Sequence, residues 1–325
     1  MSNVIYAGAR AKSLYKGLLG AERIKAMTES VNAEAALGIL SEAGFISASF
    51  DGATDYESIL SAAKTELFDF IREACPSEAL KKYLLYKNDF HNAEAFIKAK
   101  FLKLDCGELA CESGTLSASV LKERIFVDDY RSFPKAMAQA LSQCDEAFVS
   151  GTATGVAING LMEKAYFSAL FEACKKDKLL TKLCRYKADA ANVKIAIRSR
   201  DYKYAEKQFV KGGELGDAEL RALCEETPDT IKEKFKFSYI GKEIAAAADA
   251  LEKNASLSEF EKLTDDYPLK LLLINKYSTE GYYPFIIYCL YKLADIANVR
   301  IILSGLYNGE SKQDIENRLR LYYEG

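Results

Sequence analysis

The sequence contains very few of the residues from which metal sites and nucleophilic catalysts are usually built. A single histidine, His91, occurs in 325 residues, and the eight cysteines include no Cys-x-x-Cys pair. Structural zinc sites combine cysteine and histidine ligands at short spacing, so we expect no metal site. A nucleophile–histidine couple would have to use His91, and no supporting motif surrounds it. We therefore expect no catalytic residue and no cofactor.

A basic excess and a long apolar run are missing as well. Lysine and arginine number 44 against 47 acidic residues, for a net charge of −3, whereas nucleic-acid binders usually carry a basic patch. The most apolar segment, 284–307, is interrupted by three charged residues, which predicts a buried helix rather than a membrane span. Arg10, Lys12 and Lys16 interrupt the first apolar stretch and argue against a signal peptide. The scattered cysteines are expected to be free thiols in a reducing compartment.

Two glycine-rich stretches resemble phosphate-binding loops only superficially. The segment between Gly151 and Gly155 lacks the Gly-Lys-Ser/Thr ending of a phosphate loop, and no predicted strand precedes it. The same argument applies to the segment between Gly212 and Gly216. Both are predicted to be connections between helices.

One helical segment is written three times in this sequence. The copies cover 86–100, 186–200 and, more loosely, 292–305. Each contains Asp-x-x-Asn, with a long polar residue five positions after the aspartate and an aliphatic residue eight positions after it. Successive copies are separated by about a hundred residues, which is long for the common helical repeats. The sequence therefore predicts three copies of one helical unit.

Further matches support the same period. They are Glu57, Asn159 and Glu261; Ser61, Glu163 and Asp265; the triplets Gly107-Glu108-Leu109 and Gly213-Glu214-Leu215; and the triplets Glu73-Ala74-Cys75 and Glu172-Ala173-Cys174. Because they recur in one order and at similar spacing, we divide the chain into repeats 1–103, 104–208 and 209–325.

Helix signals dominate the remainder of the chain. The segment 45–50 is the only stretch with strand-like alternation and is interpreted as a connection. The segment 150–160 is predicted to be a flexible connection because it holds three glycines. The predicted helix caps are Thr54-x-x-Glu57, Ser77, Asp217, Thr227 before Pro228, Ser256-x-x-Glu259 and Ser311. The predicted fold class is all-α.

The repeated polar pair has a structural and a catalytic interpretation. Residues three apart lie on one face of a helix, and an aspartate there could act as a base. A single active site, however, does not require the same pair in three places. A buried polar pair in each unit could instead bond to backbone groups and fix how the units fit together. The structural interpretation is favoured for Asp89, Asn92, Asp189, Asn192, Asp295, Asn298 and Arg300.

On these residues the chain resembles the C-type subunits of the bacterial and archaeal V-type (A/V-type) rotary ATPases and ATP synthases, the counterparts of the d-type subunits of the eukaryotic V-ATPase. The resemblance covers nearly the whole length. It is carried by Tyr6-Ala7 with Arg10, Leu18-Leu19, Lys164-Ala-Tyr166-Phe167, the Asp189 helix, Gly212-Gly213-Glu214-Leu215, Phe260-Glu261-Lys262 with Asp265, Ala294-Asp295-x-x-Asn298-Val-Arg300, and the segment 305–323. Asn159 and Glu163 depart from the family pattern, and 103–115 shows no recognisable family feature.

The resemblance implies a funnel built from three pseudo-symmetric helical repeats, with no catalysis of its own. In that family the protein sits on the cytoplasmic face of the membrane proteolipid ring. It receives the foot of the central shaft, formed by the D and F subunits, so that ring and shaft turn as one rotor. The expected location is therefore peripheral to the membrane, without a span of its own.

Two other functions remain open on the sequence alone. The first is a helical-repeat scaffold that binds soluble partners, although its usual repeats have about 34 to 47 residues. The second is an enzyme with an unfamiliar site, against which the absence of a paired base and nucleophile argues. Failure to bind a nucleotide would count against this second alternative.

Overall fold

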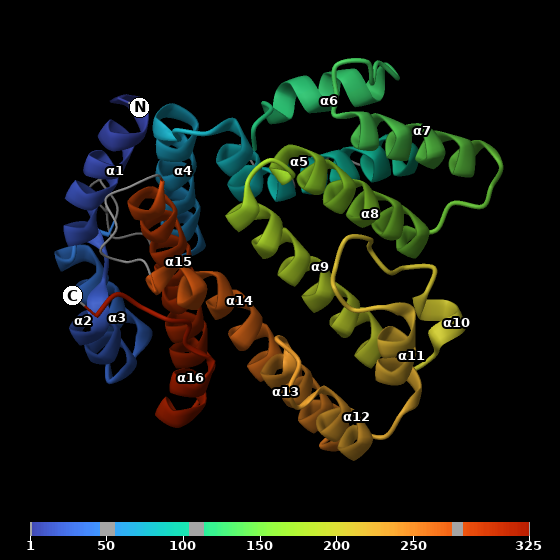
Figure 1. Ribbon diagram of the computed structural model, residues 1–325. Coiled ribbons are helices and arrows are strands. Elements are labelled where there is room, and N and C mark those ends of the chain that lie inside the picture. Colours follow the sequence, from blue (N-terminus) through green and yellow to red (C-terminus); the bar gives the residue numbers. More distant parts are fainter. Residues whose placement is uncertain (1, 46–55, 104–113, 275–281, 325) are drawn as a thin grey trace. The chain divides into compact units, whose positions relative to one another are not determined.

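The computed structural model describes residues 2–45, 56–103, 114–274 and 282–324, and every regular element within these ranges is a helix (Figure 1). The all-α prediction is therefore confirmed. Residues 46–50 of the connection predicted at 45–50 lie outside the described residues, as do the cap at Thr54, the triplet 107–109, Cys106 and Cys111.

The chain forms two compact units. Unit 1 comprises Met1–Pro76 and Ser256–Gly325, so it joins the two ends of the sequence, and unit 2 comprises Ser77–Ala255. The helices of unit 1 are α1 (Ser2–Leu14), the 3-10 turn η1 (Tyr15–Gly17), α2 (Gly20–Thr28), α3 (Ala33–Glu42), α4 (Tyr56–Ala74), α14 (Ser258–Leu273), α15 (Tyr283–Tyr307) and α16 (Lys312–Arg318). Those of unit 2 are α5 (Glu78–Leu102), α6 (Ala118–Phe126), α7 (Lys135–Val149), α8 (Gly155–Cys174), α9 (Lys178–Ser199), α10 (Tyr202–Ala205), α11 (Asp217–Glu225), α12 (Pro228–Phe235) and α13 (Gly241–Glu252).

Helix α15 is the centre of unit 1. It packs against α1, α3, α4 and α14, and most of its side chains are buried. The rings of Phe70 in α4 and Phe285 in α15 stack with centroids 5.0 Å apart. Lys292 is buried in the same helix, and its ammonium group donates to the carbonyl oxygen of Phe45 at 2.9 Å. The apolar segment predicted at 284–307 is thus a buried helix of the core.

Helices α5, α8 and α9 form the core of unit 2. Helix α5 packs along α8, α7 covers another side of α8, and α9 packs against α11 and α13. Aromatic side chains fill the α5–α8 contact, where the ring centroids of Phe90 and Tyr166 lie 5.8 Å apart. Burial of large aromatic groups dominates the energetics of such cores. Both units therefore present long central helices on which buried polar groups can be positioned.

Three of the predicted helix caps are confirmed. The hydroxyl groups of Ser77, Thr227 and Ser311 accept hydrogen bonds from the amides of Leu80, Thr230 and Asp314, at the starts of α5, α12 and α16. Pro228 follows Thr227 at the first helical position, where its missing amide hydrogen costs nothing.

The other predicted helix starts need correction. The Ser256 capping box is wrong: α14 begins at Ser258 without a side-chain cap, and the Ser256 hydroxyl bonds to that of Ser258. The connection predicted at 150–160 is too long, because the Thr154 hydroxyl caps α8, which begins at Gly155. Helix α11 is capped one residue before the predicted Asp217, at Gly216, whose amide donates to Glu219.

Candidate functional site

The six residues of the three Asp-x-x-Asn pairs are all buried, each with at most 2% of its surface exposed. They lie in the middle of α5, α9 and α15. A buried carboxylate or amide is costly unless its polar atoms are hydrogen-bonded. The hydrogen bonds of each pair therefore indicate what the pair does.

Asp89 binds the chain just before α6. One carboxylate oxygen accepts from the amide of Thr115 at 3.1 Å and from its hydroxyl at 2.6 Å, and the other accepts from the amide of Leu116 at 3.0 Å. Gly114 precedes these donors, and a Cβ atom there would lie 2.0 Å from Asp89 Oδ1. Only glycine lets the backbone approach this closely, so Asp89 fixes the loop to α5.

Asp189 binds the chain just before α11 in the same way. Its two oxygens accept from the amides of Glu214 at 2.6 Å and Leu215 at 3.1 Å, and the hydroxyl of Tyr239 provides a third donor. A Cβ atom at Gly213 would again lie 2.0 Å from the carboxylate. Burial raises the pKa of Asp189, and the three donors oppose this shift by stabilising the ionised form.

Asp295 binds a segment from the opposite end of the sequence. One of its oxygens accepts from the amide of Leu19 at 3.0 Å. The other oxygen, Oδ1, is buried and has no hydrogen-bond partner among the described residues. The amide of Leu18, at the corresponding position, donates to the carbonyl oxygen of Tyr15. Burial raises the pKa of Asp295 to about 6, only partly offset by the Leu19 amide and by Lys292. Asp295 therefore makes the same kind of contact with fewer donors.

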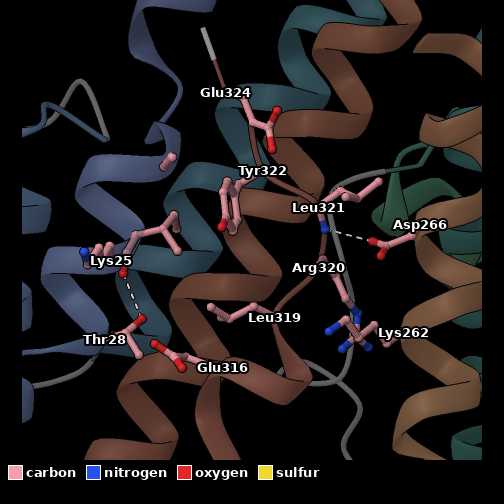
Figure 2. A pocket seen from close by; sticks show the side chains of 12 residues that line it. Lys25, Thr28, Lys262, Asp266, Glu316, Leu319, Arg320, Leu321, Tyr322 and Glu324 are labelled. Atoms are coloured by element: carbon pink, nitrogen blue, oxygen red, sulfur yellow. Dashed lines mark hydrogen bonds between the residues drawn. The ribbon is translucent and has the colours of Figure 1, made fainter. Parts of the chain in front are cut away.

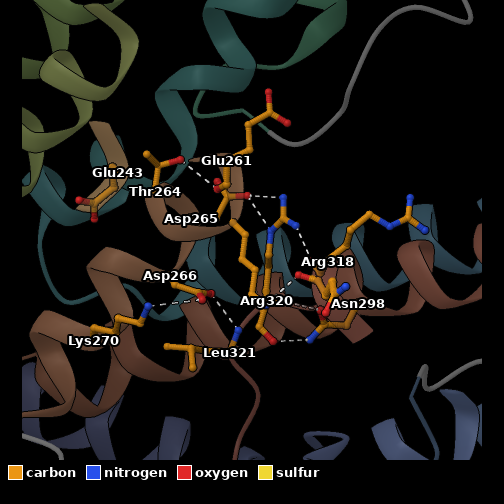
Figure 3. Close-up of polar contacts among 12 residues, drawn as sticks. Glu243, Glu261, Thr264, Asp265, Asp266, Lys270, Asn298, Arg318, Arg320 and Leu321 are labelled. Carbon is orange, nitrogen blue, oxygen red and sulfur yellow. Dashed lines mark hydrogen bonds and ion pairs between the residues drawn. The ribbon is translucent and has the colours of Figure 1, made fainter. Parts of the chain in front are cut away.

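Asn192 and Asn298 each pair with a single residue that follows the next helix along the chain. Asn192 accepts from the amide of Val210 at 2.8 Å and donates to its carbonyl at 2.9 Å. Asn298 makes the same two contacts with Arg320, at 2.7 Å and 3.1 Å (Figure 3). Asn92 is equally buried at the corresponding place in α5. An amide side chain can hydrogen-bond both the N–H and the C=O of one residue. Each of these two asparagines therefore fixes one loop residue through both of its backbone groups.

The three contacts share a pattern that the sequence analysis missed. In each case a leucine amide (Leu116, Leu215 or Leu19) donates to the aspartate. Each leucine stands just before a nine-residue helix, α6, α11 or α2. The described partner of Asp89 is Gly114-Thr115-Leu116, whereas the triplet matched from sequence, 107–109, lies outside the described residues. The signal that could have found it is a glycine two residues before the leucine, present in all three segments as Gly114, Gly213 and Gly17.

The polar position five residues after each aspartate lies near the surface. Arg300 forms an ion pair with Glu57 of α4, and both side chains are roughly half exposed. In α5 the corresponding Glu94 pairs with Lys98. Exposed ion pairs contribute at most about 1 kcal/mol each. Arg300 is therefore expected to contribute less to the stability of the fold than the six buried residues do.

The end of the chain is held by a second set of polar contacts (Figure 3). The buried carboxylate of Asp266 in α14 accepts from the amide of Leu321 at 2.8 Å. The guanidinium group of Arg320 donates to Asp265 at 2.9 Å. Burial raises the pKa of Asp266, which Leu321 and nearby cations partly oppose. These bonds fix the C-terminal segment of unit 1 between α14 and α15.

A cavity of about 450 Å³ adjoins this segment, between α2, α14 and the residues after α16 (Figure 2). Its charged side chains are of both signs, and Asp266 and Arg320 are already engaged in the contacts above. The Thr28 hydroxyl donates to the carbonyl of Ile24 in its own helix, at 2.8 Å. The polar groups of Thr28, Asp266 and Arg320 are thus engaged in contacts within the protein.

Neither a metal cluster nor a membrane helix is found in the described part of the chain. No group of three or more histidine, cysteine, aspartate or glutamate side chains there could hold a metal ion. In the same ranges, no helix combines the length and the hydropathy that crossing a membrane requires.

Comparison with known families gives a match to the family described as ATP synthase (C/AC39) subunit, over residues 7–318. The matched region contains all three Asp-x-x-Asn pairs. This chain belongs to the C/AC39 family. Its members are stalk subunits of V-type ATPases, so the protein is a subunit of a V-type ATPase complex. A search of curated proteins returned no match.

Proposed function

We propose that this C/AC39 protein is the non-catalytic rotor coupler of its V-type ATPase. It would join the membrane proteolipid ring to the central shaft of the D and F subunits, on the cytoplasmic face of the membrane. The observation that carries the proposal is the family match over nearly the whole chain.

The three Asp-x-x-Asn pairs support the proposal through their effect on rigidity. A part that transmits torque must resist local unfolding, and each aspartate ties a long helix to the segment just before a nine-residue helix. A hydrogen bond to a charged group contributes about 1.5–3 kcal/mol. We propose that the pairs are the structural positions of three repeats, and that three such repeats form the funnel expected for this family.

The hydrogen bonds favour a cyclic grouping of these repeats rather than the linear segments 1–103, 104–208 and 209–325. Under this grouping, each repeat contains one long helix with its pair and the nine-residue helix it holds: α5 with α6, α9 with α11, and α15 with α2. The third repeat then uses both ends of the chain, in agreement with the composition of unit 1. The linear boundaries stay a prediction.

The proposal is tested by removing the protein from ATPase-containing membrane vesicles of the source organism and adding it back. ATP hydrolysis by the head should persist without it, while ATP-driven ion transport should be lost and then restored by the folded chain. A heat-unfolded sample of the same chain is the control. Transport that continues at full rate in vesicles verified to lack the protein would refute the coupling role.

The partners are tested separately by pulling down the tagged chain from detergent-solubilised membranes and identifying the co-purifying chains by mass. Recovery of the ring proteolipid together with the D and F subunits is expected. Recovery of soluble partners alone, from membranes shown to contain the ATPase, would favour a helical-repeat scaffold instead.

A further inference from the structure

Unit 2 contains a groove between three of its helices. It is lined by Lys82 and Tyr86 of α5, by Pro134 and the first two turns of α7, and by the last two turns of α8 with the two residues after it. Helices α5 and α7 both pack against α8 (Figure 1). The hollow has a volume of about 1010 Å³, at the upper end of the range for small-molecule sites.

The groove is basic, although the chain as a whole is slightly acidic. Four lysines line it, Lys82, Lys135, Lys175 and Lys176, against one acidic side chain, Glu172. The net charge of the whole sequence is −3. A concentration of one charge sign in a concave surface attracts ligands of the opposite sign more strongly than isolated charges do.

Most of this positive charge is not neutralised within the protein. Glu172 is engaged by Lys175 at 2.6 Å. Among the residues that the structure describes, Lys82, Lys135 and Lys176 form no ion pair, and the contact of Lys82 is with the neutral side chain of Tyr86. Three ammonium groups thus face the groove without a counter-charge from the chain itself.

The space between these lysines exists because the residues below them are small. Ala136, Ala169 and Ala173 line the groove where larger side chains would fill the contact between α7 and α8. Ser168 and Gln139 add polar groups that can donate hydrogen bonds. An incoming chain can therefore approach the helix backbones closely while its side chains reach the lysines.

We propose that this groove docks an acidic segment of a partner polypeptide. Charge complementarity identifies the occupant: three uncompensated lysines on three different segments match several carboxylates spaced along a chain. A phosphate-sized anion would occupy a small part of the volume. Sites for such anions usually use the rigid, planar donors of arginine, and no arginine is among the described residues that line this groove. The inference goes beyond the rotor proposal and does not depend on it.

Binding of fluorescein-labelled decaglutamate to the full chain, followed by fluorescence anisotropy, tests this assignment. The test variant replaces Lys82, Lys135 and Lys176 with glutamine. We expect the fold to be kept, because none of the three lysines forms an ion pair with a described residue. The control variant replaces the exposed lysines of the same unit, Lys203, Lys211 and Lys253, and so has the same net charge. At a salt concentration of about 20 mM, where surface charges are weakly screened, the wild-type chain should bind the peptide.

The affinity should fall about tenfold in the groove variant and less than about twofold in the control, given the strength of exposed charge pairs. Replacing the same three lysines with arginine should preserve binding. Equal losses in the groove and control variants, or no binding by the wild type, would overturn the proposal. So would displacement of the peptide by inorganic phosphate at constant ionic strength, or stronger groove-dependent binding to anionic lipid vesicles.

Discussion

Asp295→Asn tests the most unusual feature of the buried pairs, a carboxylate with one oxygen left without a partner. The carboxyl group is fully buried, and its pKa is raised to about 6 from an ordinary value of 3.8. A difference of about two units corresponds to about 3 kcal/mol between the two protonation states. Because the folded state binds the proton more tightly than the unfolded chain, ionised Asp295 lowers the stability of unit 1 at pH 7.

The pH dependence follows with a definite sign. This destabilisation is fully present above pH 6 and is relieved as the pH falls toward 4, where Asp295 is protonated in both states. Other groups face the same site, namely Lys292 on α15, Glu66 on α4, and the tyrosines Tyr288 and Tyr291. The comparison should therefore use the difference in unfolding free energy between variant and wild type at each pH.

Asparagine keeps an oxygen for the Leu19 amide and removes the buried charge. We expect Asp295→Asn to raise the stability of unit 1 at pH 7 by about 1–3 kcal/mol, and to lose this advantage near pH 4. Hydrogen exchange of peptides from α2 and α15, read by mass spectrometry between pH 4 and 8 with correction for intrinsic rates, reports on this unit separately. Local readout matters because a chain with two compact units need not unfold in one step.

Asp189→Asn is the matched control, because Asp189 accepts from two amides and a tyrosine hydroxyl. An asparagine there must turn a donor toward other donors, and we expect a loss of about 1–3 kcal/mol in unit 2. Equal destabilisation by both substitutions at pH 7 would refute the reasoning. So would an Asp295→Asn effect that does not change with pH.

Four further substitutions have expected outcomes that chemical denaturation followed by circular dichroism can check. Asn192→Ala leaves the two buried backbone groups of its loop residue unpaired and should cost about 2–4 kcal/mol; a loss below about 1 kcal/mol would contradict the structural role. Gly213→Ala should destabilise unit 2 by displacing Asp189. By contrast, Gly160→Ala, a helical position with no atom within 4 Å of a new Cβ, should stabilise it by about 0.5–1 kcal/mol. Arg300→Ala should change stability by less than about 1 kcal/mol, and a larger loss would show that its ion pair is not merely superficial.

The sequence by itself determined the helical class and the positions of the three buried pairs. Helix periodicity and caps such as Thr227 before Pro228 depend on neighbouring residues, so local physics is enough to read them. The repetition of Asp-x-x-Asn pointed to a structural use because one site does not need three copies. Reliance on local patterns also explains the wrong helix cap at Ser256. Ser256 fits the capping pattern, but its hydroxyl bonds to that of Ser258.

Only the tertiary structure decided what each pair holds. Asp89 and Asp189 bind loops about 25 residues further along the chain, but Asp295 binds Leu19, 276 positions away. No local pattern encodes that distance, because the contact forms only when the two ends of the chain meet in one unit. Local sequence patterns also do not encode the unpaired oxygen of Asp295 or the lysine groove. Burial and local net charge depend on segments that are remote in the sequence and meet only in the folded unit.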